Sequence, residues 1–422
     1  MKSKMKIKKT AISMYFVLIC TLLNGSVMWR YIVGTPLNFM VLIVLQYVAC
    51  IFGIISYSNY VPKRCIYVVG MFVVYFGLYC IGTRYEPETF WIYYAGVFIC
   101  LFVYMYQVNK HNDLEVLFDS FVNIVFIIAT LSLFFWLFGS ILNVLPGRTL
   151  LNYEWANRTY PTYTYYGLYF ENPIQSEQIL FGKRSVRNSG IYAEVPGYAE
   201  VLLYALKIEL LSEKKRKYRF IILLMALLST SSTKGLLVFV IVIIVDYITR
   251  KEYKKRIYQI MKFIFSGILV VCGIFVCVYI LQDKSQTGSY SVRMDDIHAA
   301  IVTWEKYPLF GVGYNNIRAV AQNFQVPRNS DGLSMGLTAL LAQGGLYLVG
   351  MYIMAVICAI RYASQYRHEI VVFCLMIIVN LFISNSAFSS LMIITLAVAF
   401  STVSNYKNKK VKNRRYPYYL EE

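Results

Sequence analysis

Long runs of apolar residues, separated by short polar segments, recur along almost the whole chain. A helix needs about 20 such residues to cross the hydrocarbon core of a membrane. The strands of a membrane barrel alternate in short segments, so the uncharged runs 120–147 and 332–360 exclude that class. The pattern predicts an all-α polytopic protein with about twelve transmembrane helices: 10–27, 37–57, 66–81, 90–106, 116–145, 190–211, 220–230, 235–249, 258–281, 333–360, 370–383 and 388–403.

Two long apolar stretches are each predicted to form a hairpin of two short helices. Segments 214–219 and 250–256 are both strongly basic, and basic segments favour the cytoplasm. One helix between them would place them on opposite sides, so a turn is expected at 231–234. The stretch 370–406 is too long for one span, and its polar segment 383–390 offers a turn.

Composition and charge agree with a membrane protein. Hydrophobic residues make up 58% of the chain and charged residues 15%, and the mean hydropathy is +0.53. The net charge of +19 does not predict a nucleic-acid partner, because Lys and Arg of membrane proteins collect in cytoplasmic loops. With the Lys-rich amino terminus inside, the inner segments carry about twice as many Lys and Arg as the outer ones. Both termini are therefore expected on the cytoplasmic side of the plasma membrane.

The order of the spans divides the chain into five parts. They are a five-helix membrane segment (1–145), a first large extracellular loop (146–189), central helices with a short hairpin (190–281), a second large extracellular loop (282–332), and a three-helix segment with a basic cytoplasmic tail (333–422). Loops as long as these two are usually functional or disordered. The functional surface is therefore expected at the outer leaflet.

The first long loop is rich in aromatic side chains interleaved with polar ones. This mixture suits sugar rings, which have apolar faces edged by hydroxyl groups. The alternative is an interfacial aromatic belt, which many membrane proteins carry. The aromatic residues are Tyr153, Trp155, Tyr160, Tyr163, Tyr165, Tyr166, Tyr169 and Phe170.

Cations at the outer edge oppose the orientation bias and so indicate a specific partner. A diphosphate is the expected anion, because guanidinium groups bind phosphate oxygens bidentately and neutralise charge that develops on a leaving diphosphate. The alternative is snorkelling, or ion pairing with Glu177, Asp295 or Asp296. The cations are Lys183, Arg184, Arg187, Lys234 and Arg293.

Glu194, at the entry of the sixth predicted span, is the candidate general base, because partial desolvation at a membrane boundary suits a carboxyl group to proton transfer. The alternative is a buried carboxylate paired with Arg187. His298 is a second candidate base, or a structural residue of its loop. The chain has no metal-ligand spacing and no Walker-type phosphate loop, so neither metal nor other cofactor is expected.

Three stretches resemble the signatures of the O-antigen polymerase and O-antigen ligase superfamily. They are 187–194 (R-N-S-G-I-Y-A-E, then V-P-G), 229–235 (S-T-S-S-T-K-G) and 293–314 (R-M-D-D-I-H-A-A-I-V-T-W-E-K-Y-P-L-F-G-V-G-Y). The third is the most specific, with an Arg, a Trp about ten residues later, and a Pro-Leu-hydrophobic-Gly-hydrophobic-Gly turn. The resemblance covers roughly residues 187–348, including Gly344 and Gly345, whereas the first five spans match only in hydropathy.

The resemblance implies a metal-independent membrane glycosyltransferase of the GT-C type, which acts on undecaprenyl-diphosphate-linked glycans at the outer leaflet. Arg187 and Arg293 match Arg positions that the family uses for the lipid diphosphate, and Lys234 stands where many members have Arg. Glu194 matches a recurrent acidic position. Tyr314, at the end of the third stretch, is counted among the substrate-binding residues.

One departure bears on the reaction. The ligase branch usually has His-Asn before the span that begins near Leu333, whereas this chain has Arg328 and Asn329 there. The difference favours a polymerase of capsule, exopolysaccharide or O-antigen type, with Asp331 in a proton-handling role. The alternatives are a ligase-like transferase to another acceptor, and a flippase or exporter of lipid-linked oligosaccharides. Expected partners are the lipid-linked oligosaccharides, membrane lipids, and a chain-length regulator and flippase of the same pathway.

Overall fold

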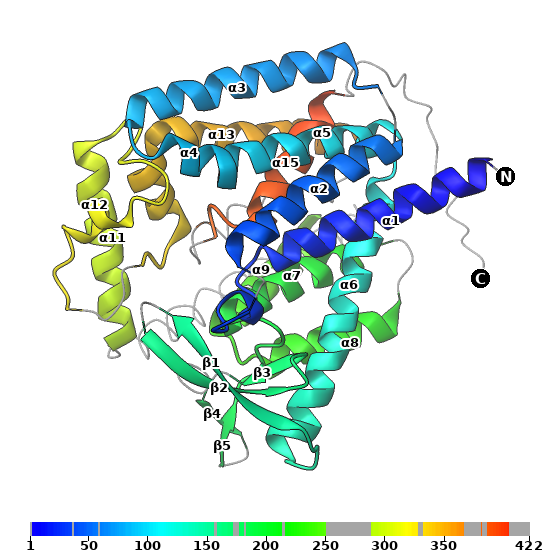
Figure 1. Ribbon diagram of the computed structural model, residues 1–422, viewed down its shortest axis with the longest axis vertical. Helices are drawn as coiled ribbons and strands as arrows, with labels where there is room; N and C mark the ends of the chain where they lie inside the picture. Colours follow the sequence, from blue (N-terminus) through cyan, green and yellow to red (C-terminus); the bar gives the residue numbers. More distant parts are fainter. Residues whose placement is uncertain are drawn as a thin grey trace, which may run out of the picture.

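The computed structural model describes most of the chain, and the described part is mostly helical (Figure 1). The described residues are 2–35, 38–57, 60–155, 158–171, 177–180, 183–212, 216–249, 288–327, 332–366, 381 and 386–404. The predicted span 258–281, almost all of 370–383, and Asp331 lie outside these ranges.

Helices from both ends of the chain pack side by side. α1 (Lys2–Leu23), α2 (Phe39–Tyr57), α5 (Gly96–Lys110), α15 (Ser390–Ser404) and α13 (Gly336–Tyr366) contact one another in this order (Figure 1). The short helix η1 (Met28–Arg30) lies between α1 and α2, and α3 (Lys63–Thr83) follows α2. α4 (Pro87–Phe90) and the π-helical turn η2 (Trp91–Ala95) lead into α5, and α6 (Leu114–Phe134) ends in the π-helical turn η3 (Phe135–Ile141).

The first long loop folds into two small antiparallel sheets, so the expectation of an all-α chain is wrong there. β1 (Arg148–Trp155), β2 (Arg158–Tyr165) and β3 (Tyr169–Glu171) form one sheet in that order, and β4 (Glu177–Leu180) pairs with β5 (Lys183–Val186). Thr and Tyr, which favour strands, alternate along β2. This period-two alternation was the signal in the sequence for a strand.

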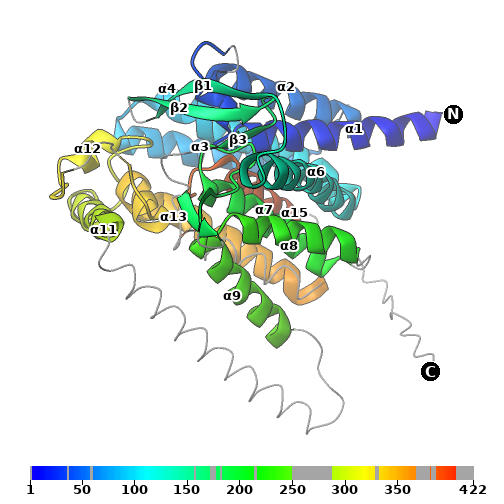
Figure 2. The same cartoon turned by 90° about the horizontal axis from the view of Figure 1, so that it is seen from below.

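α7 (Val195–Leu211), α8 (Lys217–Ser229) and α9 (Thr233–Thr249) follow the sheets. α8 and α9 are separated at residues 230–232, a break that overlaps the turn predicted at 231–234, and Ser231 has a φ of 45° there. α11 (Gly288–Lys306) and α12 (Ile317–Ala321) lie at the end of the molecule opposite to the amino terminus in both views (Figure 1, Figure 2).

An ion-pair network fixes the start of α8 against α6 and α7. Arg216 and Arg219 both contact Asp119 of α6, at 3.0 and 2.8 Å, and Arg219 also lies 3.7 Å from Glu209 near the end of α7. Arg219 and Glu209 are buried, and charges out of water are stabilised only when they are paired. The network therefore holds α8 in place, and with it the turn at the other end of that helix.

Five helices are long and apolar enough to cross a membrane: Phe39–Tyr57, Lys63–Thr83, Pro87–Lys110, Leu114–Ile141 and Gly336–Arg361. Shorter apolar helices cover Lys9–Leu23, Gly235–Ile244 and Ser390–Thr402. The chain is thus an integral membrane protein with several spans. These helices coincide with predicted ones, whereas α7 begins at Val195 rather than at residue 190 because 190–194 is bonded to other segments.

Candidate functional site

The segment 187–194 passes from β5 to α7 and is bonded to three other parts of the chain. Its main chain joins the α8–α9 turn, β3 and the loop between α1 and α2. The hydrogen bonds run from Asn188 N to Ser229 O (3.1 Å), from Phe170 N to Gly190 O (3.1 Å), from Met28 N to Ile191 O (2.8 Å) and from Ala193 N to Ser26 O (2.8 Å). This first signature stretch is therefore a fixed junction rather than a free loop.

The side chain of Asn188 reinforces the junction from inside. Its amide nitrogen donates to the hydroxyl groups of Ser229 (2.9 Å) and Ser132 (3.3 Å), and its oxygen accepts from the amide of Gly190 (3.0 Å). Asn188 is fully buried, where an unpaired amide would be costly. Asn188 was not among the predicted site residues, although it stands next to Arg187 in the first stretch.

Arg187 joins the first stretch to the second one. Its Nε donates to the main-chain oxygen of Thr230 (2.8 Å), and a terminal nitrogen donates to that of Ser231 (3.1 Å). Burial lowers the pKa of Arg187 from its usual value. Lys234 lies in the first turn of α9, just after these two carbonyl groups. The structure therefore brings together Arg187 and the segment that carries Lys234.

Glu194 is the N-cap residue of α7, with extended backbone angles of −127° and 134°. It is half-buried and lies within electrostatic range of two tyrosines. Burial raises the pKa of Tyr31, Arg30 lowers it and Glu194 raises it; burial, Tyr160 and Glu194 all raise the pKa of Tyr153. The carboxylate of Glu194 is thus in electrostatic range of Tyr31, which follows η1, and of Tyr153 in β1, whereas the Arg187 guanidinium is bonded to the α8–α9 turn.

Arg30, the last residue of η1, stacks on aromatic rings. Its guanidinium carbon lies 3.9 Å from the ring centre of Phe39 and 5.5 Å from that of Tyr31. The ring of Phe39 is in turn stacked on Tyr93 of the π-helical turn η2, with centroids 4.5 Å apart. Arg30 was not among the predicted site residues, although it too is a cation in a predicted outer loop.

Tyr314 ends the third stretch and lies among aromatic rings. Its ring centre is 5.2 Å from that of Phe388, 5.7 Å from that of Phe90 and 5.9 Å from that of Tyr94. Burial raises the pKa of Tyr314 to about 12, and Arg30 opposes this shift. Arg30 is therefore in electrostatic range of both Tyr314 and Tyr31.

The Pro-Leu-Phe-Gly-Val-Gly turn of the third stretch inserts into a break in α13. Main-chain hydrogen bonds join the two on both sides of the break: Leu346 N to Pro308 O (2.9 Å), Tyr347 N to Leu309 O (2.9 Å), Val312 N to Ala342 O (2.9 Å) and Gly313 N to Gln343 O (3.1 Å). Gly345 interrupts the helix with a φ of 59° and a ψ of −169°, which are essentially restricted to glycine. The glycines of both segments permit this close approach of two backbones.

Arg293 lies on α11 with an exposed side chain, which makes no hydrogen bond or ion pair within the described ranges. The two neighbouring carboxylates are buried and hold the segment before α13. Asp295 accepts from the amides of Gln325 (2.9 Å) and Val326 (3.1 Å), and Asp296 accepts from the hydroxyl of Ser334. His298 is exposed on the same helix.

Some of the remaining predicted residues lie in the described part of the chain, and others lie outside it. Lys183 and Arg184 belong to β5, directly before Arg187, and Asp331 lies outside the described residues. Tyr153, Tyr165, Tyr169 and Phe170 of the first long loop are buried, whereas Tyr166 has 63% of its surface exposed. In the described chain, no group of three His, Cys, Asp or Glu side chains could hold a metal ion.

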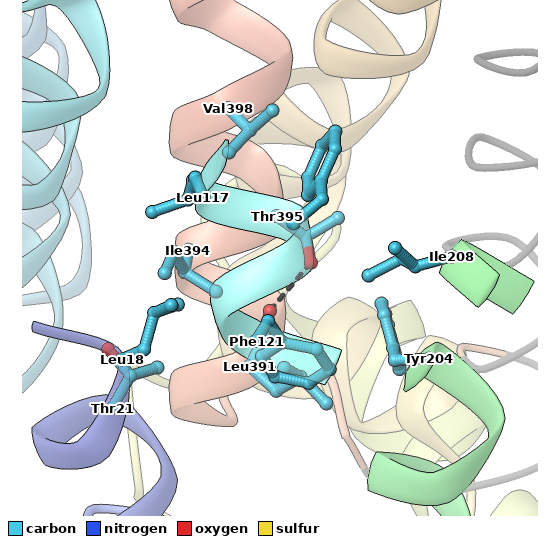
Figure 3. Close-up of a pocket in the computed structure, with 11 residues that line it drawn as sticks. Leu18, Thr21, Leu117, Phe121, Tyr204, Ile208, Leu391, Ile394, Thr395 and Val398 are labelled. Atoms are coloured by element: carbon cyan, nitrogen blue, oxygen red, sulfur yellow. Dashed lines mark hydrogen bonds between the residues drawn. The ribbon is translucent and has the colours of Figure 1, made fainter. Parts of the chain in front are cut away.

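An apolar pocket opens between α1, α6, α7 and α15 (Figure 3). Its lining includes Leu18, Leu117, Phe121, Tyr204 and Ile394. The hydroxyl group of Thr395, which also lines the pocket, donates a hydrogen bond to the carbonyl oxygen of Leu391 (2.7 Å). None of the predicted site residues lines this pocket. The polar groups described above therefore lie outside this pocket.

The fold and the site define an integral membrane protein in which cationic, acidic and aromatic residues gather around loops that join its helices. Residues 219–346 match the family model described as O-antigen ligase. The match runs from α8 through the α8–α9 turn to the break in α13, so it includes the second and third stretches. The predicted resemblance is confirmed here and indicates an O-antigen ligase/polymerase-type membrane enzyme. No curated protein and no solved structure matches the chain.

Proposed function

We propose that this protein is a polysaccharide polymerase. It joins oligosaccharide repeat units carried on undecaprenyl diphosphate at the outer leaflet, in the synthesis of a capsule, exopolysaccharide or O-antigen-type polymer. The observation that carries the proposal is the double hydrogen bond of Arg187 to the α8–α9 turn. It joins the stretch that contains Glu194 to the region that matches the O-antigen ligase model.

In the proposed reaction, Glu194 accepts the proton of an acceptor hydroxyl whose oxygen attacks the anomeric carbon of the sugar on the diphosphate. The new carbon–oxygen bond forms as the bond from that carbon to the diphosphate oxygen breaks, and its electron pair leaves with the lipid diphosphate. Arg187, Arg293 and Lys234 stabilise the charge that develops on this leaving group. Glu194 then releases its proton to water.

The other predicted residues have roles in the same proposal. Lys183 and Arg184 bind the diphosphate or the glycan, Tyr314 contacts a sugar ring, and Asp331 handles a proton. The proposal places these groups at the outer leaflet, in a GT-C-like arrangement of about twelve spans with both termini in the cytoplasm. The five-part division of the chain, with two large extracellular loops, belongs to the same proposal.

A ligase-like transfer to a different acceptor is the second candidate, because the matching family model is described as O-antigen ligase. The two reactions share the lipid-diphosphate donor and differ only in the acceptor. Arg328 in place of the His usual in the ligase branch favours the polymerase.

The test is an elongation assay with purified protein in liposomes that contain a lipid-diphosphate-linked repeat unit. A polymerase gives a ladder of products, and a ligase-like enzyme transfers the glycan only when another acceptor is added. Arg187→Ala and Arg293→Ala are expected to abolish the ladder. Arg318→Ala, which removes an exposed cation of α12, is the charge-matched control. If labelled lipid crosses the bilayer and no elongation occurs, the proposal of an enzyme is wrong and the protein is a flippase.

A further inference from the structure

We propose that Arg30 is a further anion-binding residue of this site and that its guanidinium contacts an oxyanion of the lipid diphosphate. The inference rests on the proposed function and adds a residue from the loop between α1 and α2, outside the region matched by the family model. Three observations support it: the loop backbone is fixed, the guanidinium is stacked on a ring with its donors available, and it lies in electrostatic range of Tyr31 and Tyr314.

The loop that carries Arg30 is held on two sides. On one side, Met28 and Ser26 are bonded to the 187–194 segment, as described above. On the other side, residues 31–33 extend the sheet, since Glu154 N donates to Tyr31 O (2.8 Å) and Val33 N donates to Asn152 O (3.0 Å). The indole nitrogen of Trp29 donates to Gly167 O (2.9 Å). A residue fixed in this way can bind a ligand without the cost of ordering its backbone.

The guanidinium of Arg30 is half-buried and stacked on Phe39, yet no described residue uses its donors. Within the described ranges it makes no hydrogen bond and no ion pair. Arg187 differs, because two of its nitrogens already donate to carbonyl groups. A planar guanidinium whose face rests on an aromatic ring leaves its edge free for bidentate contact with phosphate oxygens. Arg30 therefore has the larger unmet capacity to bind an anion.

Arg30 also acts electrostatically on residues near groups that the proposed reaction uses. It is in electrostatic range of Tyr31, which is in range of Glu194 as well, and of Tyr314 at the end of the third stretch. The π-helical turn η2 supplies both Tyr93, which backs Phe39, and Tyr94, which packs on Tyr314. An anion bound at Arg30 would thus adjoin the candidate base and the aromatic residues at once.

The test measures binding of radiolabelled inorganic diphosphate to the full-length protein in detergent by equilibrium dialysis. Arg30→Gln keeps most of the side chain that packs on Phe39 and removes the charge. It is expected to weaken diphosphate binding about ten- to hundredfold, the usual effect of losing a charge-assisted hydrogen bond. Phe39→Leu should weaken it less, and Arg318→Ala should leave it unchanged. Unfolding temperatures of all variants show whether each is folded.

Equal diphosphate affinity of Arg30→Gln and the native protein would overturn the proposal, as would an absence of diphosphate binding by the native protein. Glucuronate as a second probe separates the sources of an oxyanion: loss of glucuronate binding alone would assign Arg30 to an acidic sugar and overturn the diphosphate contact.

Elongation kinetics distinguish this proposal from the function on which it rests. If the native protein binds diphosphate through Arg30 but makes no polymer, the polymerase proposal is refuted and the proposed Arg30 contact stands. A native protein that makes polymer, with the same KM for the lipid-linked substrate in Arg30→Gln, refutes the Arg30 contact and leaves the polymerase.

Discussion

The main-chain oxygen of Leu309 lies against the α-carbon of Gly345, so closely that a β-carbon on Gly345 would overlap it. This contact joins the Pro-Leu-Phe-Gly-Val-Gly turn to the break in α13. A β-carbon on Gly311 of the turn would in turn lie 2.5 Å from the carbonyl carbon of Gln343. The turn at 308–313 and the break in α13, which lie about 30 residues apart in the sequence, thus pack backbone against backbone.

Gly345→Ala is expected to destabilise the protein by about 2 kcal/mol or more, because alanine must adopt a backbone conformation almost restricted to glycine while its methyl group displaces Leu309. Gly350→Ala is the matched control on the same helix, since no atom lies within 4 Å of its added β-carbon. The measurement is thermal unfolding in detergent. Equal unfolding temperatures of the two variants would contradict the interlocked turn.

Asn188→Ala should cost about 1–3 kcal/mol of stability, because it removes three buried hydrogen bonds and takes away the side-chain oxygen to which the Gly190 amide donates. The loss should appear in denaturant unfolding of the purified protein and should reduce elongation in parallel. Gln322→Ala, at an exposed position after α12, is the control. A fully stable Asn188→Ala protein would show that the junction does not depend on this amide.

Arg187→Lys is expected to lower elongation at least tenfold although the charge is kept. A single ammonium group cannot reproduce the fork with which Arg187 holds the oxygens of Thr230 and Ser231. Arg318→Lys provides the same exchange at an exposed position and should have no effect. If Arg187→Lys elongates at the native rate, the positive charge alone is what matters there.

Stability should fall as the pH rises above about 10. Burial raises the pKa of Tyr31 and, together with Glu171, Tyr198 and Tyr165, that of Tyr169, from ordinary values of 10. The neutral phenols therefore favour the folded state fully below about pH 10, and this contribution is lost as the pH rises toward the higher pKa of the folded state. Unfolding temperatures between pH 8 and 11 measure the effect. Tyr169→Phe should flatten the decline, whereas the exposed Tyr166→Phe should not; a decline of equal slope in both would contradict the assignment.

The sequence predicted the positions of several apolar helices because their signals are local, whereas α11 lies in a segment that was expected to be a loop. A run of apolar residues long enough to span a membrane identified α2 and α3, and two basic flanks identified the break between α8 and α9. The order of residues around Glu194 likewise predicted a helix entry, although Ile191 and its neighbours bind other segments before α7 begins.

The sequence could not predict contacts between distant segments. The pairing of Tyr31 with Glu154 and of Trp29 with Gly167 fixes the loop that carries Arg30 against the first long loop, and no local pattern encodes such pairing. The strands of the first long loop were missed because its tyrosines were interpreted as ligand-binding or interfacial, whereas Tyr165 and Tyr169 form a small core. The contacts of Arg187 are to the α8–α9 turn, and the expected position of Arg293 beside Arg187 stays a prediction.

The most direct test of the central claim is the rate at which purified Glu194→Gln joins two lipid-linked repeat units, compared with the native protein. Gln keeps the size and polarity of the N-cap residue but cannot accept the proton. The account predicts that Glu194→Gln still binds the lipid-linked substrate and joins units about a hundredfold or more slowly, as expected for loss of a general base. A variant that joins units at the native rate would contradict the proposed role of Glu194 and the reaction built on it.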